Sequence, residues 1–416
     1  MELDITVQIS GKDVLAGKLY QSVRHGDETT TFSYVPSYLD DPRSFSLAPD
    51  MPLGPGSFHS TGLRGLRAFE DCMPDRWGRN LMLRAERAQA RVEHRTPRTL
   101  FEVDMLAGVN DEARQGAIRV WNTDGEVVSS VRNGVPRETS VPALLEASDR
   151  AVQDIDADVR DLLAAGSSLG GARPKASVRD EQGFLCIAKF PKADEGPLDD
   201  VCAWEHVCLR LMDQAGITVP TSRLLRVGGR SVLLVRRFDR AGDARLPYIS
   251  GLSAIQGEDG GRYSYLELAE FIEEEGSRPA LDLRELWMRA LFSCAVGNTD
   301  NHLRNYGFLR EKTGWMLSPA FDVNPTPGSE RKYLATGLDF DNRETEPEVA
   351  FAVCDFFRVN SAEACDVAAG MARVLGGWRR LARADGISEA SQEIMADCFE
   401  AGIRKLKAVA RKGRTR

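Results

Sequence analysis

Apolar and polar residues alternate in the first third of the chain, a pattern typical of β-strands with one buried face. The alternation predicts short strands over residues 5–9, 14–20 and 31–35, and another over 116–121. Between them, a Pro-Asp pair followed by apolar residues at helical spacing predicts a helix over roughly 75–92. The beginning of the chain is therefore expected to be mixed and rich in strands.

The middle of the chain combines helical and strand patterns. Residues 122–138 are polar and contain Gly and Pro, which predicts a boundary between domains. Apolar residues at helical spacing over 201–215, followed by Gly216, predict an amphipathic helix. The other elements expected here are helices over 141–152 and 156–165, a strand over 184–190, and a hairpin of strands 223–226 and 231–238.

Helical periodicity dominates from Tyr263 onward. Helices are predicted over 265–275, 283–296, 367–384 and 389–412, and two short strands over 306–309 and 315–317. This order predicts an α+β fold, in which a small β-rich lobe and a helical C-terminal lobe follow a small mixed β-rich N-terminal domain. We place the three parts at residues 1–125, 126–245 and 246–416.

Composition and charge narrow the class of protein. The chain has 416 residues, of which 42% are hydrophobic and 28% are charged. These are ordinary values for globular domains, and they exclude a disordered or fibrous chain. The 54 Lys and Arg residues against 62 Asp and Glu give a net charge of −8. An acidic protein is a poor DNA binder by itself, because neutralising phosphates requires a basic face.

The beginning of the sequence and the cysteines predict a cytoplasmic protein. The N-terminus lacks the basic and apolar segments of a secretory signal, and the longest apolar run, 286–296, is too short to cross a bilayer. The eight cysteines form no CxxC pair and mostly lie in apolar patterns, which predicts buried, reduced thiols. The five scattered histidines form no zinc motif. We expect neither membrane association nor a zinc site.

The strongest candidate chemistry lies after the helix predicted at 283–296. Asp300 and Asn305 stand five residues apart, the spacing at which protein kinases place a catalytic base and a Mg²⁺ ligand. Asp322 follows the predicted hairpin, where its carboxylate could reach the same metal, although the kinase Asp-Phe-Gly triplet is absent and Asp-Val-Asn stands there. Asp and Asn also abound in loops because they form Asx turns, so this spacing alone does not establish a catalytic loop.

Three features further upstream could bind a nucleotide. The glycine-rich turn at 167–175 could offer N–H groups to an anion, but it is neither a Walker A loop nor a Rossmann fingerprint and could be only a tight turn. Lys189 ends a predicted strand, and Glu205 on the next helix could pair with it. Alternatively, Lys189 extends to water and Glu205 is solvated. Together, however, these features occur in the order found in kinases.

Several segments match the pattern of one bacterial family. In the N-terminal part they are Val-Leu-Ala-Gly at 14–17, Phe-Ser-Tyr at 32–34 and Phe-Glu-Asp-Cys-Met-Pro-Asp at 69–75. Further along they are residues 168–175, 188–190, 204–205 and 235–240, the motif Thr299-Asp300-x-His302-x-x-Asn305, and Ser-Pro-Ala-Phe-Asp at 318–322. On these segments the chain resembles the HipA family, the serine/threonine-kinase toxins of bacterial toxin–antitoxin systems, over nearly its whole length. The resemblance implies a bilobal protein-kinase-like core.

The resemblance also implies roles for individual residues. Asp300 is expected to be the general base, and Asn305 and Asp322 are expected to hold Mg²⁺. Lys189 would contact the ATP phosphates. Residues 236–238 would meet adenine. Some relatives have Glu where this chain has Arg236, so only recognition through the backbone is carried over. The expected nucleotide-binding set is Ser168, Leu169, Gly170, Gly171, Ala172, Lys175, Lys189, Glu205, Arg236, Arg237, Phe238 and His302. Of these, the role of His302 stays open.

Ser168 matches the serine that family members autophosphorylate. A phosphate there would add about −1.5 to −2 charges beside an anion-binding turn. It would compete with ATP for the N–H groups of that turn and repel it. We therefore hypothesise that phosphorylated Ser168 marks an inactive state.

The implied function is ATP- and Mg²⁺-dependent phosphorylation of a protein Ser or Thr, leading to growth arrest through a target such as a translation component. The implied partner is a HipB-like helix-turn-helix antitoxin, through which the complex would mainly meet DNA. The alternative is a weakly active or inactive kinase-fold subunit that serves as an antitoxin-bound corepressor. Its basic C-terminal residues 404–416 could touch phosphates, or they could be a solvated helix end. A small-molecule kinase is a third possibility.

Overall fold

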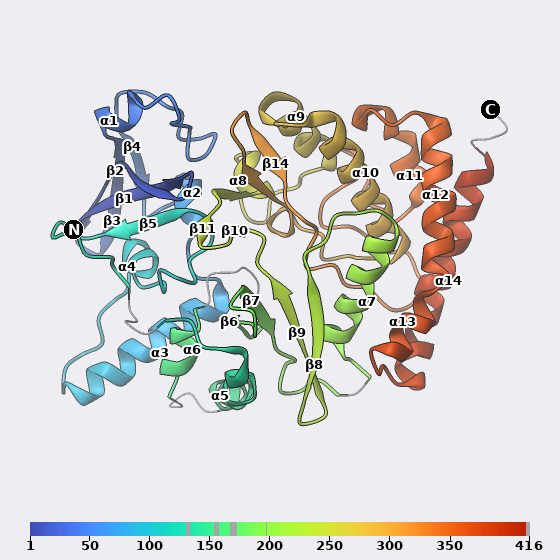
Figure 1. The fold of residues 1–416 in the computed structure, drawn as a ribbon, viewed down its shortest axis with the longest axis horizontal. Coiled ribbons are helices and arrows are strands. Elements are labelled where there is room, and N and C mark those ends of the chain that lie inside the picture. The colour runs from blue at the N-terminus through green and yellow to red at the C-terminus, as the bar shows by residue number, and fades with distance from the viewer. Residues whose placement is uncertain (130–133, 154–157, 167–172, 197, 413–416) are drawn as a thin grey trace. The chain divides into compact units, whose positions relative to one another are not determined.

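The computed structural model describes residues 1–129, 134–153, 158–166, 173–196 and 198–412, which form two compact units (Figure 1). Unit 1 comprises Met1–Ala193 and Leu234–Ile249, and unit 2 comprises Asp194–Leu233 and Ser250–Arg416. The chain therefore passes between the units three times. These units divide the chain at other positions than the three predicted parts, whose boundaries stay a prediction.

Unit 1 contains a five-stranded antiparallel sheet with the order β4-β3-β2-β1-β5. Alternate residues of β1, namely Leu3, Ile5 and Val7, are buried, because successive side chains of a strand point to opposite faces. The strands predicted from this alternation are confirmed. They are β1 (Glu2–Ile9), β2 (Lys12–Arg24), β3 (Asp27–Tyr34) and β5 (Ile118–Trp121), whereas β4 (Phe58–Thr61) was not predicted.

The longest helix described in unit 1, α3 (Arg76–Val92), confirms the helix predicted at 75–92. Asp75 is its N-cap, and its side chain accepts a hydrogen bond from the Gly78 N–H at 2.8 Å. The remaining helices are α1 (Pro36–Leu39), α2 (Arg67–Glu70), α4 (Glu102–Ala107), η1 (Glu138–Ser140), α5 (Val141–Gln153) and α6 (Arg160–Ala164). The helix predicted at 156–165 is thus shorter within the described residues.

Two strands of unit 1 form an antiparallel hairpin, β6 (Lys175–Arg179) with β7 (Leu185–Lys189). The strand at β7 was predicted, whereas β6 was missed because its first residue was assigned to the glycine-rich turn. Lys175 and Lys189 are register partners at the end of this hairpin. Three short strands complete the unit: β10 (Arg240–Ala241), β11 (Ala244–Arg245) and β12 (Tyr248–Ser250), the last of which ends in unit 2.

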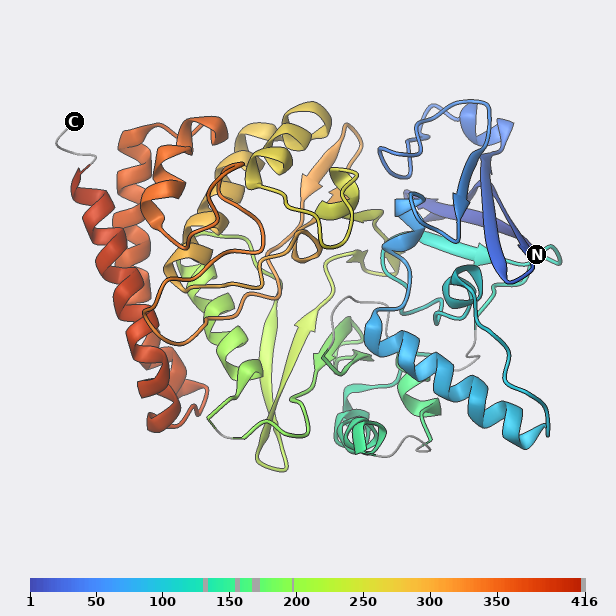
Figure 2. The ribbon, with the colours of Figure 1, turned by 180° about the vertical axis from the view of Figure 1, so that it is seen from behind.

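Unit 2 is mainly helical, as predicted, and helices α12 and α14 run side by side along it (Figures 1 and 2). The rings of Trp204, Trp378 and Phe399 pack together and join α7, α13 and α14, with the last two ring centroids 4.8 Å apart. The helices are α7 (Val201–Gln214), α8 (Gly251–Ala254), α9 (Tyr265–Glu275), α10 (Pro279–Ala295), η2 (Leu303–Asn305), α11 (Pro347–Ala352), η3 (Cys354–Phe357), α12 (Ser361–Leu375), α13 (Trp378–Ala384) and α14 (Glu389–Lys412). The strands are β8 (Ser222–Val227), β13 (Gly307–Arg310), β14 (Trp315–Leu317) and β9 (Arg230–Arg236), which ends in unit 1.

The single helix predicted at 367–384 is wrong. The structure has two helices there, α12 and α13, separated at Gly376 and Gly377. Glycine costs about 1 kcal/mol in a helix interior relative to alanine, and two in succession favour a break. The apolar periodicity on either side is real, but it belongs to two helices.

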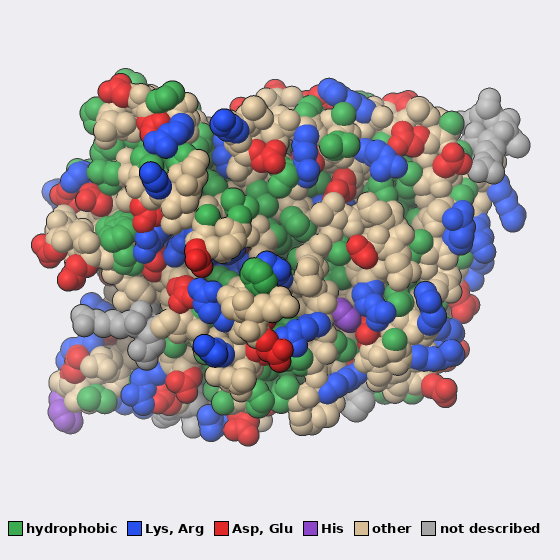
Figure 3. All heavy atoms as spheres, viewed as in Figure 1, with side chains coloured by type: hydrophobic (Ala, Val, Ile, Leu, Met, Phe, Trp, Pro, Cys, Tyr) green, Lys and Arg blue, Asp and Glu red, His purple; other side chains and the backbone are tan. Residues whose placement is uncertain are grey.

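The burial of the cysteines and the distribution of charged side chains on the surface are those of an ordinary globular protein. All eight cysteines are buried and free, which confirms the predicted burial. Figure 3 shows acidic and basic side chains intermixed over the visible face. Among the described residues, no helix combines the length and the apolar character needed to cross a membrane.

Candidate active site

The loop at residues 298–305, hereafter the 298–305 loop, follows α10 directly. The helix ends at Ala295, and Gly297 with a φ of +59° turns the chain away from it. Asp300 projects from this loop with its side chain 79% exposed. Partial loss of hydration raises the pKa of Asp300; His302 lowers it, and the carboxylate of Asp322 raises it further. The carboxyl groups of Asp300 and Asp322 thus influence each other electrostatically.

Asn305 is oriented by the backbone of Asp300. Its Nδ2 donates a hydrogen bond of 2.8 Å to the Asp300 carbonyl oxygen, and its own N–H donates to the carbonyl of His302 at 2.8 Å. The side-chain amide of Asn305 therefore has its nitrogen engaged, which leaves the Oδ1 side for a ligand. The spacing read from the sequence corresponds to a real local contact.

Asp322 follows the β13–β14 hairpin, and its backbone is in the left-handed region with a φ of +59°. Non-glycine residues adopt this conformation rarely, and such strain persists only where surrounding contacts hold it. One of these contacts is Glu205, whose Oε1 accepts a hydrogen bond from the Asp322 N–H at 3.2 Å. The left-handed backbone thus sets the direction of the Asp322 side chain.

Glu205 is 3% exposed and lies on α7. The alternative of a solvated helix residue is therefore wrong. Its carboxylate holds the backbone of Asp322 within unit 2. Lys189, the partner expected from the sequence, is also buried, at 8% exposed, but it belongs to unit 1, so their pairing stays a prediction.

Helix α10 holds the segment that leads to Asp322. Asp282 accepts a hydrogen bond from the Leu317 N–H at 2.9 Å, and the buried Arg289 donates to the Ser318 carbonyl at 2.6 Å. Burial raises the pKa of Asp282, while the Leu317 N–H lowers it. This role could not be predicted from the sequence, because both residues lie within a largely apolar helix.

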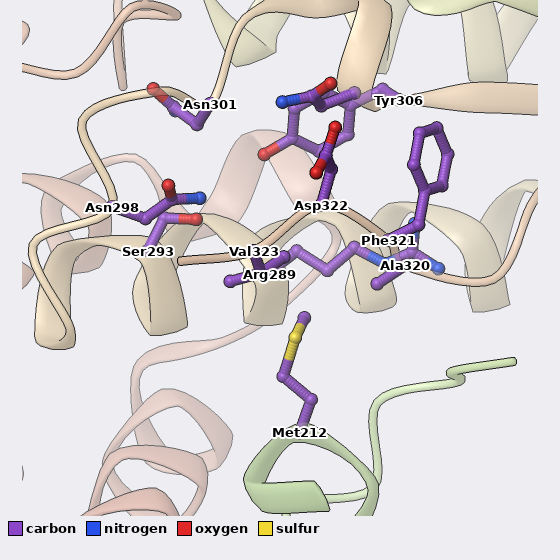
Figure 4. Close-up of a pocket in the computed structure, with 11 residues that line it drawn as sticks. Met212, Arg289, Ser293, Asn298, Asn301, Tyr306, Ala320, Phe321, Asp322 and Val323 are labelled. Atoms are coloured by element: carbon purple, nitrogen blue, oxygen red, sulfur yellow. The ribbon is translucent and has the colours of Figure 1, made fainter. Parts of the chain in front are cut away.

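Asn305 and Asp322 line one small pocket in unit 2 (Figure 4). Its volume is about 10 Å³, roughly the space of one water-sized sphere. Figure 4 shows the Asp322 carboxylate pointing toward Tyr306. Carboxylate and amide oxygens are ligands that Mg²⁺ accepts, with water or phosphate oxygens completing its octahedron. By the chemistry of their oxygen atoms, Asn305 and Asp322 therefore fit as two ligands of a Mg²⁺ ion.

Asn301 is a site residue that the sequence analysis missed. It is 1% exposed, and its Nδ2 donates to the Tyr265 hydroxyl at 2.8 Å. Its Oδ1 accepts from the N–H groups of Ala335 and Thr336, at 2.7 and 3.3 Å. Tyr265 in turn shares a hydrogen bond with the Tyr306 hydroxyl. Asn301 thus fixes the 298–305 loop to a segment more than thirty residues further along.

His302 is half-exposed, and its Nε2 lies 3.9 Å from the nearer Asp300 carboxylate oxygen. This distance is too long for a hydrogen bond, so the interaction is purely electrostatic. Nδ1 of the same ring is buried and has no hydrogen-bond partner in the described part of the chain. His302 therefore adjusts the charge of Asp300 rather than holding it in place.

The predicted nucleotide-binding residues of unit 1 fall into two groups. Ser168, Leu169, Gly170, Gly171 and Ala172 lie outside the described residues. Lys175, by contrast, starts β6 and is 4% exposed. Its ammonium group forms an ion pair of 3.1 Å with the buried carboxylate of Asp75, the cap of α3. A phosphate contact for Lys175 stays a prediction, beside this structural role.

The segment at 236–238 makes specific contacts within unit 1. The guanidinium of Arg236 stacks over the ring of Phe184. The Arg237 N–H donates to the Leu185 carbonyl at 2.9 Å, and its side chain binds Asp239 at 2.8 Å. The ring centroids of Phe238 and Tyr248 are 6.2 Å apart. Since the Arg237 N–H already donates to Leu185, a hydrogen bond to adenine in this segment would have to come from other backbone groups.

The fold and the site together define a mixed α+β protein with a small pocket, lined in part by Asn305 and Asp322, beside an Asp- and Asn-bearing loop. Two family models match the chain: the HipA N-terminal domain over residues 7–103 and the HipA-like C-terminal domain over residues 167–401. Since the second alone covers more than half of the chain, the chain belongs to the HipA family. The resemblance inferred from the motifs is confirmed.

Sequence relatives and a solved structure agree with this assignment. A protein of Sinorhizobium fredii named putative kinase Y4mE is 26% identical over 335 residues, 73% of each chain. A putative kinase of Haemophilus influenzae is 28% identical over 190 residues, 39% of this chain and only 54%, about half, of that relative. The fold is similar to a chain of the Shewanella oneidensis toxin–antitoxin complex of HipA, HipB and operator DNA, with a TM-score of 0.69, 16% identity and coverage of 100% and 99%. The predicted α+β fold class is confirmed.

Proposed function

We propose that this chain is an ATP- and Mg²⁺-dependent protein serine/threonine kinase. One observation carries the proposal: Asn305 and Asp322 line one pocket of ion size, and the Asn305 amide is held by the backbone of Asp300. Phosphoryl transfer depends mainly on positioning and charge neutralisation, which such a set of groups can provide. The relatives named as putative kinases support it.

Each residue of the site has a distinct task in this proposal. Asp322 and Asn305 would hold Mg²⁺, which supplies positive charge against the phosphates when bound. Asp300, exposed on its loop, accepts the hydroxyl proton of the acceptor serine or threonine as its oxygen bonds to the terminal phosphorus of ATP and ADP leaves. Glu205 is a positioning residue, because it holds the backbone of Asp322. From unit 1, Lys189 would contact the phosphates of ATP.

At the level of the cell, we propose that the chain is the toxin of a toxin–antitoxin pair in the cytoplasm. The Shewanella relative of similar fold was solved with HipB and operator DNA. By analogy, a HipB-like antitoxin is the expected partner here and carries the complex to DNA, which suits a chain of net charge −8. The phosphorylated target is expected to be a protein such as a translation component, and Ser168 is the proposed site of autophosphorylation.

The test is transfer of labelled phosphate from ATP by the wild type and by Asp300→Asn. General-base catalysis contributes about 100- to 10,000-fold to the rate. The rate of phosphate transfer by Asp300→Asn should therefore fall at least about 100-fold. Asp397→Asn is the matched control, because Asp397 is exposed on α14 in the same unit. Asp322→Asn should abolish Mg²⁺-dependent binding of ATP.

The same experiment separates the competing functions. Equal transfer by the wild type and Asp300→Asn would contradict the proposed base. No transfer by a wild type that still binds its antitoxin would favour the corepressor function. Transfer to a metabolite with no labelled protein would indicate a small-molecule kinase. Phosphoproteomics of cells expressing wild type or Asp300→Asn would then identify the target.

A further inference from the structure

A second hollow, hereafter the arginine groove, lies beside the 298–305 loop in unit 2. Its volume is about 490 Å³. The residues that line it are Arg262, Thr299, Tyr333, Leu334, Ala335 and Arg343. Thr299 directly precedes Asp300, and the Cα atoms of consecutive residues are about 3.8 Å apart. The arginine groove therefore begins one residue from the proposed catalytic base.

One wall of the arginine groove is fixed to the 298–305 loop by Asn301. The Oδ1 of Asn301 accepts from the N–H of Ala335, a lining residue, at 2.7 Å. Arg343 stiffens the same wall, because it donates to the carbonyls of Leu334 and Ala335 at 2.9 and 2.6 Å. These bonds involve buried or half-buried groups, so the wall is a built surface and not a loose loop.

A second wall, which carries Arg262, is fixed to the same loop by a different residue. Arg304 forms a bidentate ion pair with Asp259, at 2.8 and 2.7 Å, three residues before Arg262. The two walls also bond to each other, since the Gly337 N–H donates to the Tyr263 carbonyl at 2.8 Å. The position of the arginine groove relative to Asp300 is therefore set by hydrogen bonds on both sides.

The residues that line the arginine groove carry positive charge. Two of its six lining residues are arginines, and none is an acid. Nearby arginines have carboxylate partners, Arg304 with Asp259 and Arg331 with Glu344. Arg262, in contrast, is exposed and makes no hydrogen bond or ion pair with any described residue. A guanidinium group left in this way favours a carboxylate or another oxyanion, which it can bind with two parallel hydrogen bonds.

We propose that the arginine groove binds acidic side chains of the protein that this chain phosphorylates. The inference rests on the proposed kinase function and specifies its substrate. An extended peptide rises about 3.3 Å per residue, so a carboxylate at the groove belongs about two to four residues from the acceptor serine or threonine at Asp300. The site therefore selects acceptor segments flanked by Asp or Glu.

The test measures binding of short fluorescent peptides to the full chain by anisotropy. The peptides carry alanine in place of the acceptor serine and are flanked by Glu, by Gln or by Lys. The Glu peptide should bind about tenfold more tightly than the Gln peptide, the value of about one well-formed charged contact. Arg262→Gln should remove this difference. Arg383→Gln, which changes an exposed arginine of α13 in the same unit, should preserve it.

Several results would overturn the proposal. The first is equal binding of the Glu and Gln peptides by the wild type. The second is a preference for the Glu peptide that persists in Arg262→Gln. The third is tight binding of a single-stranded oligonucleotide through Arg262 with no binding of the Glu peptide. Melting temperatures of both variants show whether they are folded. Because the peptides contain no acceptor, failure of the groove is separate from failure of phosphate transfer, which is measured on the wild type and Asp300→Asn.

Discussion

Asn301 accepts a hydrogen bond of 2.7 Å from the backbone N–H of Ala335 and thereby ties together the 298–305 loop and a segment far along the chain. The same side chain donates to the Tyr265 hydroxyl at 2.8 Å and is almost completely buried. Buried polar groups of this kind are costly to leave unpaired and hold one arrangement of the backbone. Asn301 is therefore a positioning residue, because it holds the loop that carries its neighbour Asp300.

Replacing Asn301 with alanine should lower both stability and activity. The change leaves the N–H groups of Ala335 and Thr336 without their side-chain acceptor, at a cost of about 1–3 kcal/mol for a buried group, while the Tyr265 hydroxyl keeps only its bond to Tyr306. Urea denaturation should show this loss, and kcat for phosphate transfer should fall more than KM for ATP changes. Asn80→Ala, at an exposed position of α3, should stay within about 0.5 kcal/mol of the wild type. A stable Asn301→Ala with normal kcat would contradict the positioning role.

Local pattern was sufficient to predict many elements of the fold. Helices α9 (Tyr265–Glu275) and α14 (Glu389–Lys412) have the predicted bounds. In α9 the reason is visible, because Ser264 and Glu267 form a capping box that fixes the start. The Asp300 and Asn305 spacing was readable for the same reason, since their contact is confined to one loop.

Long-range contacts could not be predicted from the sequence. Lys175 seemed part of a glycine-rich turn, yet it pairs with Asp75, a hundred residues earlier. Glu205 had a plausible solvated alternative because only the fold shows that it faces the backbone of Asp322. Partners so distant in the sequence leave no periodic signal, and a buried polar residue differs from an exposed one only after the chain has folded.

Because Lys175 and Asp75 form a buried ion pair, removing one partner should destabilise the protein much more than replacing both. Burial raises the pKa of Asp75, while the charge of Lys175 lowers it. Removing one partner of a buried ion pair costs about 3–5 kcal/mol, so Lys175→Met should be strongly destabilised. The double variant Asp75→Asn with Lys175→Met should recover most of this loss, because Asn still caps α3 and no buried charge is left. Chemical denaturation of the four proteins of this cycle measures the coupling.

The pH dependence of the stability of Lys175→Met tests independently whether the unpaired carboxylate of Asp75 causes the loss. Without Lys175 the folded pKa of Asp75 should rise further above its unfolded value. A group whose folded pKa is raised contributes stability below the unfolded pKa, and this contribution is lost as pH rises through the folded pKa. The variant should therefore be closest to the wild type in acid and fall behind it toward neutral pH. A constant difference across this range would mean that Asp75 is not the source.

The pH–rate profile should report the charges around Asp300. A base must be deprotonated, so phosphate transfer should rise with pH through the pKa of Asp300, and that pKa lies above the ordinary value of about 3.9. His302 lowers this pKa, so His302→Gln should move the acidic limb to higher pH. His59→Gln, an exposed histidine of unit 1, is the control. An acidic limb that stays in place in His302→Gln would remove Asp300 as its origin.

Two glycines of neighbouring helices should respond in opposite directions to the same substitution. In α14, a Cβ on Gly402 would collide with the backbone carbonyl of Ala295, the last residue of α10, three residues before the 298–305 loop begins. Gly402→Ala should therefore push α10 and its loop away from α14 and reduce both stability and phosphate transfer. In α12, a Cβ on Gly370 meets nothing within 4 Å, so Gly370→Ala should stabilise the protein by about 0.5–1 kcal/mol, since alanine has the higher helix propensity. Urea denaturation compares the two variants. If both were stabilised, α14 would not pack against the end of α10 as the structure has it, and the helix would have no part in placing Asp300.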